Sequence, residues 1–218
     1  MTAAGSIGLV AVFAVDLLSL IYISRLGDPK LTAAVGFGTQ VQFFATSLHI
    51  GLAIAIGAVV SRALGAGKRE RARRLAGASL WLGVALSLAT VAILMPLRAP
   101  ILAAFGAQGE TRDIAASFLA VTLPANILFS LGMSLSAILR AAGDGRRAMY
   151  VTLFGGVATA ILDPIFIFGL GLGVHGAAIV IVVSRFVFAA VGWWGAARVH
   201  NLVGPPQRES LGADLRVV

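Results

Sequence analysis

Residues 149–170 read MYVTLFGGVATAILDPIFIFGL, an apolar run in which Asp163 is the one charged side chain. At about 1.5 Å per residue, a helix of this length crosses the roughly 30 Å hydrocarbon core of a bilayer. Runs of 18 or more apolar residues with few charges are typical of membrane spans. The stretch therefore predicts a transmembrane α-helix.

The chain on both sides of this run has the same character. Of its 218 residues, 59% are hydrophobic and 12% are charged, whereas soluble domains are about 45–50% apolar and about 25% charged. We therefore predict an all-α membrane protein in which residues 1–200 form six transmembrane helices. We expect residues 201–218 to be a cytoplasmic linker at which the chain is cut before a further helix. The expected spans are 2–24, 33–61, 75–97, 114–139, 149–170 and 176–198.

The net charge of +8 fits either nucleic-acid binding or an orientation signal. The Lys and Arg residues lie between the apolar runs, so we favour orientation and expect a lipid bilayer, not a nucleic acid, as the partner. The positive-inside rule then places both termini in the cytoplasm, as in a multi-pass protein of the plasma (bacterial inner) membrane. The basic segments contain Arg62, Lys68, Arg69, Arg71, Arg73 and Arg74; Arg140, Arg146 and Arg147; and Arg198, Arg208 and Arg216.

Ionisable groups inside the spans are costly and are functional candidates for that reason. They are Asp16, His49, Asp163 and Arg185. Asp16 and Asp163 each lie about 14 residues into a span that runs outward, so both are expected about 21 Å from the cytoplasmic face. Neighbouring carboxylates at one depth could share a cation or hold a proton. The alternative is two separate, hydrogen-bonded packing residues.

Other polar groups could contribute oxygen atoms. Thr159 lies one turn before Asp163 on the same helix face. Pro164 cannot donate to the carbonyl of Ala160, which leaves either a free oxygen ligand for Na⁺ or hydronium, or a simple kink. Pro124 likewise frees the carbonyl of Ala120, and Asn126 adds a nearby amide, but we favour a hinge with an interhelical hydrogen bond.

His49 could relay protons, although a hydrogen-bonded packing histidine is the more frequent arrangement. A further set of polar, aromatic and Met side chains could line a substrate cavity, but each alone also fits helix packing. This set is Gln40, Gln42, Phe43, Phe44, Asn126 and Met133. The chain has no cysteine and contains no hydrolytic triad or metal-binding motif. We therefore expect a protein that is not an enzyme and has no cofactor.

Several segments together resemble the multidrug and toxic compound extrusion (MATE) transporters. They are Val15-Asp16, LRAAGDGR at 139–146, ILDPIFIFG at 161–169 and GVHGAA at 173–178. The resemblance implies one six-helix lobe, the N-terminal one, of a twelve-helix transporter. It also implies export of cationic or amphipathic drugs and metabolites by alternating access, driven by Na⁺ or H⁺. The second lobe is then a partner, on the same chain or on another.

In part of this family, the coupling ion binds an Asp of the first helix, an Asn and an Asp four apart in the fifth, and a Thr of the sixth. Asp16 and Asp163 match the two carboxylates, whereas Thr159 stands where the Asn is expected and Ile181 where the Thr is expected. Because Ile181 has no oxygen ligand for Na⁺, we favour H⁺ as the coupling ion.

Two other functions fit the same architecture. A related flippase for lipid-linked oligosaccharides would line its cavity with many Arg and Lys residues, whereas Arg185 alone lies within a span here. An inactive half-transporter or non-transporting membrane subunit is also compatible with the length of the chain.

Overall fold

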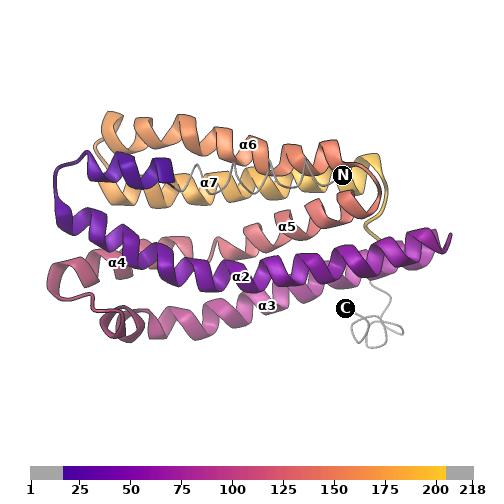
Figure 1. Ribbon diagram of the computed structural model, residues 1–218, viewed down its shortest axis with the longest axis horizontal. Helices are drawn as coiled ribbons and strands as arrows, with labels where there is room; N and C mark the ends of the chain where they lie inside the picture. The colour runs from indigo at the N-terminus through magenta and orange to yellow at the C-terminus, as the bar shows by residue number, and fades with distance from the viewer. Residues whose placement is uncertain (1–16, 205–218) are drawn as a thin grey trace.

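The computed structural model describes residues 17–204, and every regular element in that range is a helix. The helices lie side by side in an elongated bundle, and successive spans run in opposite directions (Figure 1). The predicted all-α membrane class is confirmed. Residues 17–24 form the visible part of the first helix. The other elements are α2 (Pro29–Gly65), α3 (Arg69–Ala104), α4 (Gly109–Thr122), α5 (Asn126–Ala141), α6 (Gly145–Pro164) and α7 (Gly173–Trp193), with the π-helical turns η1 (Ile165–Gly169) and η2 (Trp194–Val199).

These helices account for five of the six predicted spans. Helices α2 and α3, together with Gly145–Gly169 and Gly173–Val199, are each long and apolar enough to cross a membrane. The predicted span 114–139 is instead a broken one, because α4 and α5 meet at a bend of 50°. The hinge expected at Pro124 is thereby confirmed. The predicted first span, 2–24, lies mostly outside the described residues, as does the predicted linker beyond Gly204.

Basic turns gather at one end of the bundle. A hydrogen bond of 2.7 Å joins Arg69 Nη2 to the carbonyl oxygen of His200, and Gly204 N donates to the carbonyl of Arg73. We call this the basic end, defined by residues 62–74, 140–147 and 198–204. At the opposite end, Lys30 Nζ lies 2.6 Å from a carboxylate oxygen of Glu110. A contact between His200 and Asp144 joins the third segment, so the described parts of the three segments that the charge pattern predicts on one side of the membrane lie together. Arg208 and Arg216 lie outside the described residues.

The interior contains two apolar clusters with polar side chains between them. The cluster near the basic end includes Ile56, Leu75, Leu135, Ile138 and Val151, and the opposite cluster includes Ile23, Leu102, Phe118, Leu119 and Ile167. Along α6 and η1, the order is Val151, then Thr159 and Asp163, then Ile167. We call the buried polar side chains between the clusters the polar layer. They are Gln42, His49, Ser87, Asn126, Thr159, Asp163, Ser184 and Arg185.

Glycines allow α5, α6 and α7 to approach one another closely around Phe188. A Cβ atom on Gly155 would lie 1.6 Å from Phe188 Cε1, and one on Gly132 would lie 2.8 Å from Phe188 Cβ. Close approach over small residues is the usual way for membrane helices to gain packing contacts, because lipid provides little hydrophobic drive between them. These contacts hold in place the helices that carry Asp163 and Arg185.

Candidate functional site

Asp163 lies in the polar layer, in the last turn of α6, and is 1% exposed. Its Oδ2 accepts a hydrogen bond from the hydroxyl of Ser19 in the first helix. Its Oδ1 is buried and has no hydrogen-bond partner within the described part of the chain. A buried carboxylate oxygen without a partner is costly. This oxygen is therefore a site at which a proton or a cation would be stabilised.

The Ser19 contact shows that the first helix and α6 are neighbours at this depth. Sequence reasoning missed Ser19, although its spacing of three residues from Asp16 is that of one helix face. Asp16 itself lies outside the described residues, so its distance from Asp163 stays a matter of prediction.

The neighbours of Asp163 differ in what they can offer an ion. Thr159 is 6% exposed, and its hydroxyl donates to the carbonyl of Gly155 at 3.1 Å. Its oxygen keeps a lone pair on the face of α6 that also carries Asp163. Ile181 packs against the apolar cluster of the opposite end. Thr159 thus adds a hydroxyl oxygen on the helix face of the carboxylate, whereas Ile181 adds none.

His49 is 1% exposed, and both of its ring nitrogens have partners. Nδ1 lies 2.6 Å from the carbonyl oxygen of Ala45, and Nε2 lies 2.8 Å from Ser87 Oγ. A carbonyl oxygen only accepts, so Nδ1 carries the hydrogen in the neutral ring. Ser87 Oγ also lies 2.8 Å from the carbonyl oxygen of Gly83, so this carbonyl and Nε2 compete for its one hydrogen. These contacts join α2 to α3 and are those of a packing histidine; a relay role stays a prediction.

A second polar group lies at the break between α4 and α5. Asn126 Nδ2 donates to Gln42 Oε1 at 3.0 Å, and Arg185 Nη1 donates to Asn126 Oδ1 at 2.7 Å. Arg185 also donates to the carbonyl of Thr122 at 3.0 Å, and its guanidinium lies 5.4 Å from the ring centroid of Phe129. The interhelical hydrogen bond predicted for Asn126 is confirmed. Arg185 thus binds a carbonyl at the C-terminal end of α4, next to the bend.

The six residues predicted to line a cavity do not lie together. Gln40, Phe43 and Phe44 lie on the exposed face of α2, where the two aromatic side chains are 55% and 67% exposed. Gln42 and Asn126 bind each other inside the bundle. Met133 is 7% exposed and belongs to the apolar cluster near the basic end. The structure therefore brings only Gln42 and Asn126 of this set into contact, and the cavity role stays a prediction.

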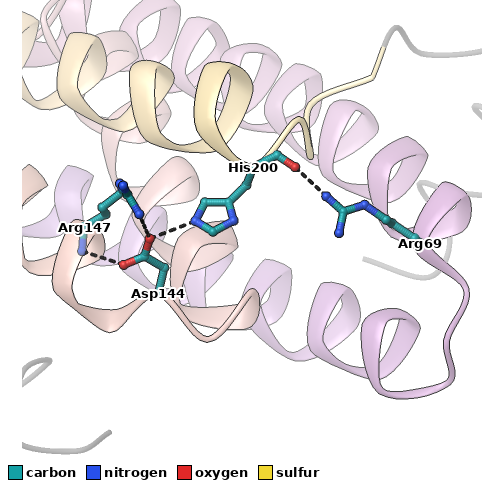
Figure 2. A network of polar contacts seen from close by, with 4 residues as sticks. All are labelled: Arg69, Asp144, Arg147 and His200. Carbon is teal, nitrogen blue, oxygen red and sulfur yellow. Dashed lines mark hydrogen bonds and ion pairs between the residues drawn. The ribbon is translucent and has the colours of Figure 1, made fainter.

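A network of polar contacts at the basic end contains Arg69, Asp144, Arg147 and His200 (Figure 2). Asp144 caps α6, because its Oδ1 accepts from Arg147 N at 3.0 Å. Its Oδ2 lies 2.5 Å from Arg147 Nη1 and 2.8 Å from His200 Nε2. Burial alone would raise the pKa of Asp144, but the hydrogen bonds from Arg147 and His200 together hold it well below its usual value. The network joins the turn before α6 to the end of η2.

A bundle of membrane-spanning helices with a polar layer at mid-depth is the architecture of a polytopic integral membrane protein. The family model MatE matches residues 6–165. The chain belongs to this family, the MATE transporters that its motifs resemble, and the predicted family and N-terminal lobe are confirmed. Members of the family are transporters, not enzymes.

Two curated relatives and a solved structure support this assignment. The probable multidrug resistance protein NorM of Thermotoga maritima is 33% identical over 167 residues, covering 74% of this chain and 36% of NorM. The multidrug export protein MepA of Staphylococcus aureus is 32% identical over 178 residues, covering 79% of this chain and 38% of MepA. A MOP superfamily transporter from Pyrococcus furiosus has a TM-score of 0.88 and 29% identity, covering 100% of this chain and 49% of that chain. The chain thus spans about half the length of that transporter.

Proposed function

We propose that this lobe forms half of an ion-coupled antiporter that exports cationic or amphipathic drugs and metabolites by alternating access. A second six-helix lobe, on the same chain or on another, completes the pathway. The observation that supports the proposal is Asp163, whose two oxygens differ: one accepts from Ser19 of the first helix, and the other is buried without a described partner. Two relatives of the chain are described as multidrug resistance and multidrug export proteins.

The proposed coupling step takes place at this carboxylate. In the ionised state, Asp163 accepts the Ser19 hydrogen bond and favours the drug-bound conformation. Binding of H⁺ from outside neutralises the charge and turns one oxygen into a donor, which changes how the first helix packs on α6. A ligand shifts such an equilibrium only by its differential affinity for the two states. Protonation removes the free-energy cost of burying the carboxylate charge, and this cost can differ between the two conformations. Asp16 is proposed to act with Asp163.

We favour H⁺ over Na⁺ as the coupling ion, with no other cofactor. Na⁺ needs several oxygen ligands, and of the two neutral ligand positions Thr159 keeps a hydroxyl oxygen whereas Ile181 contributes only apolar packing. A proton needs only the carboxylate. We also propose that the basic end faces the cytoplasm of a cell whose plasma (bacterial inner) membrane holds the protein, with both termini on that side.

The test is Asp163→Asn, which keeps the size of the side chain and its acceptor for Ser19 but removes the titratable group. Drug efflux and drug-induced proton movement are measured in vesicles reconstituted with this lobe together with its second lobe, and H⁺ and Na⁺ gradients are imposed in separate runs. We expect coupled efflux to fall at least about tenfold, the loss of roughly 1.4 kcal/mol or more of coupling free energy. The matched control is Asp113→Asn, whose carboxylate is 73% exposed at the opposite end. Unchanged H⁺-coupled efflux in Asp163→Asn would contradict the proposal.

No observation on the described residues favours the two other functions. A flippase would present several cationic side chains to its cavity, whereas the mid-span Arg185 is 9% exposed and binds Asn126 and the carbonyl of Thr122. A non-transporting subunit would have no need of a buried carboxylate with an open oxygen. The same efflux measurement tests both alternatives.

A further inference from the structure

An apolar groove of about 350 Å³ lies between α3, α5 and α7, near the basic end. Leu80, Trp81 and Val84 of α3 form one wall, and Leu131 and Trp193 form the other. Trp81 is 60% exposed and Trp193 is 50% exposed. Indole rings favour the level of the lipid headgroups, where their apolar body and polar N–H are both accommodated. The groove thus begins at headgroup depth and extends toward the hydrocarbon.

Two arginines stand at the basic end of this groove. Arg73 precedes Gly77, Leu80 and Trp81 at spacings of four, seven and eight residues, so it lies on the same stripe of α3 as the groove wall. Its Cγ lies 2.9 Å from the Cβ position of Gly204, which also lines the groove. The Nε atoms of Arg73 and Arg74 are buried without a hydrogen-bond partner within residues 17–204. Helical side chains point toward the N-terminus, which directs both guanidinium groups to the headgroup level.

The surroundings favour an anion. Residues 62–74 contain six Lys or Arg side chains against Glu70 alone. Beyond the groove, every exposed residue of α3 from Trp81 to Leu97 is apolar, which suits lipid contact and offers no polar group to a protein partner. A basic site between transmembrane helices, above an apolar groove, matches the two parts of an anionic phospholipid.

We propose that this groove binds one anionic phospholipid, with an acyl chain along Leu80, Val84 and Leu131 and its phosphate at Arg73 and Arg74. The lipid would hold α3 against α7 at the point where the chain leaves η2. This site is separate from Asp163 and does not depend on the proposed transport function.

The test uses tryptophan quenching by brominated lipids in reconstituted vesicles. The chain has three tryptophans, so Trp194→Phe leaves Trp81 and Trp193 as the reporters. Dibromostearoyl phosphatidylglycerol and dibromostearoyl phosphatidylcholine are compared at equal, low mole fractions. We expect the anionic lipid to be preferred, and each lost arginine contact to lower that preference about fivefold. Arg73→Gln with Arg74→Gln should bring the preference close to one, whereas the double Lys variant should keep it.

The matched control is Arg71→Gln, because Arg71 is exposed and lies on the side of α3 opposite to Arg73. It removes the same charge but should leave the preference within about twofold, since charges separated by solvent are screened. If the double Gln variant does not fold, Val84→Phe fills the groove without changing the charge and should lower quenching by phosphatidylglycerol. Equal quenching by both lipids, or an equal loss in Arg71→Gln, would overturn the proposal. Quenching by neither lipid would do so as well, because a second lobe or a second copy would then cover the groove.

Discussion

The outer faces of α2 and α3 differ, although the two helices have nearly the same length and each is apolar enough to cross a membrane. Between Thr39 and Leu48, the exposed side chains of α2 are those of Thr39, Gln40, Phe43, Phe44, Ser47 and Leu48. Between Trp81 and Leu97, every exposed side chain of α3 is apolar: Trp81, Ala85, Leu88, Ala89, Ala92, Ile93, Pro96 and Leu97. Polar groups at mid-membrane depth face protein or water, because lipid cannot hydrogen-bond them. We therefore expect α2 to face the interior of a larger assembly and α3 to face lipid.

The largest expected effect comes from placing a charge on each face. Leu88 and Ser47 lie near the middle of α3 and α2, respectively. An aspartate at the centre of a lipid-facing helix costs about 2.5–3.5 kcal/mol on insertion scales. Leu88→Asp should therefore lower the yield of folded protein roughly 100-fold, whereas Ser47→Asp should be tolerated. Membrane yield followed by gel filtration measures both, and equal yields would remove the distinction between the faces.

Thiol reactivity gives the next largest difference. The chain has no cysteine, so single-cysteine variants report one position each. The thiolate is the reactive form, and it does not form in hydrocarbon. A water-soluble maleimide should label Ser47→Cys at least about tenfold faster than Leu88→Cys. Lys68→Cys lies in the exposed turn between the two helices and gives the labelling rate of a fully accessible thiol. Slow labelling at both mid-span positions would show that α2 faces lipid as α3 does.

A smaller effect is expected on transport. Phe44 is 67% exposed on α2, and Ile93 is 58% exposed on α3. An aromatic contact with an amphipathic substrate contributes about 1 kcal/mol, so Phe44→Ala should lower efflux of a cationic dye about fivefold. Ile93→Ala should leave efflux within about twofold at matched expression. Equal losses would mean that substrate does not distinguish the two helices.

The smallest expected effect is on stability at the basic end. There, Arg69 of α3 binds the carbonyl of His200, and the His200 ring binds Asp144. Within the described residues, no such chain of hydrogen bonds joins α2 to Asp144. The lowered pKa of Asp144 means that the folded state binds a proton less readily than the unfolded state. Its contribution is therefore present above an ordinary pKa of about 3.9 and is lost as the pH falls through the lowered pKa. Asp144→Asn should cost about 1 kcal/mol at pH 7, and the difference from the native protein should shrink below about pH 4.

Thermal unfolding at several pH values measures this loss, and hydrogen exchange locates it. Amides of residues 69–73 should exchange faster in Asp144→Asn, whereas those of 58–62 in α2 should not change. Glu110→Gln, which removes an exposed ion pair at the opposite end, should have no measurable effect. A loss that persists in full at low pH would show that the carboxylate charge is not what stabilises this end.

Much of the fold could be read from the sequence because membrane spans impose a strong pattern. Apolar length predicted five described spans, and the alternation of basic turns predicted which turns meet. Pro124 predicted the hinge but not its angle, because a proline removes a donor without setting the direction in which the chain continues. Asp163 could be predicted as a functional candidate because a carboxylate without a function has a high free-energy cost inside a membrane. Its partner Ser19 did not, since a hydroxyl in a helix usually bonds to its own backbone.

By itself, the sequence determined that the chain crosses a membrane in helices, which end is basic and which family it belongs to. Length, hydropathy and motifs are properties of one segment at a time, and insertion of a helix into a bilayer depends mainly on the length and hydropathy of that segment. Only the tertiary structure decided that Gln42 and Asn126 face each other while Gln40 faces outward, that Ser19 meets Asp163, and that polar groups of five helices share one layer. Those pairings depend on how each helix is rotated about its axis, and that rotation is set by packing against neighbours far away in the chain.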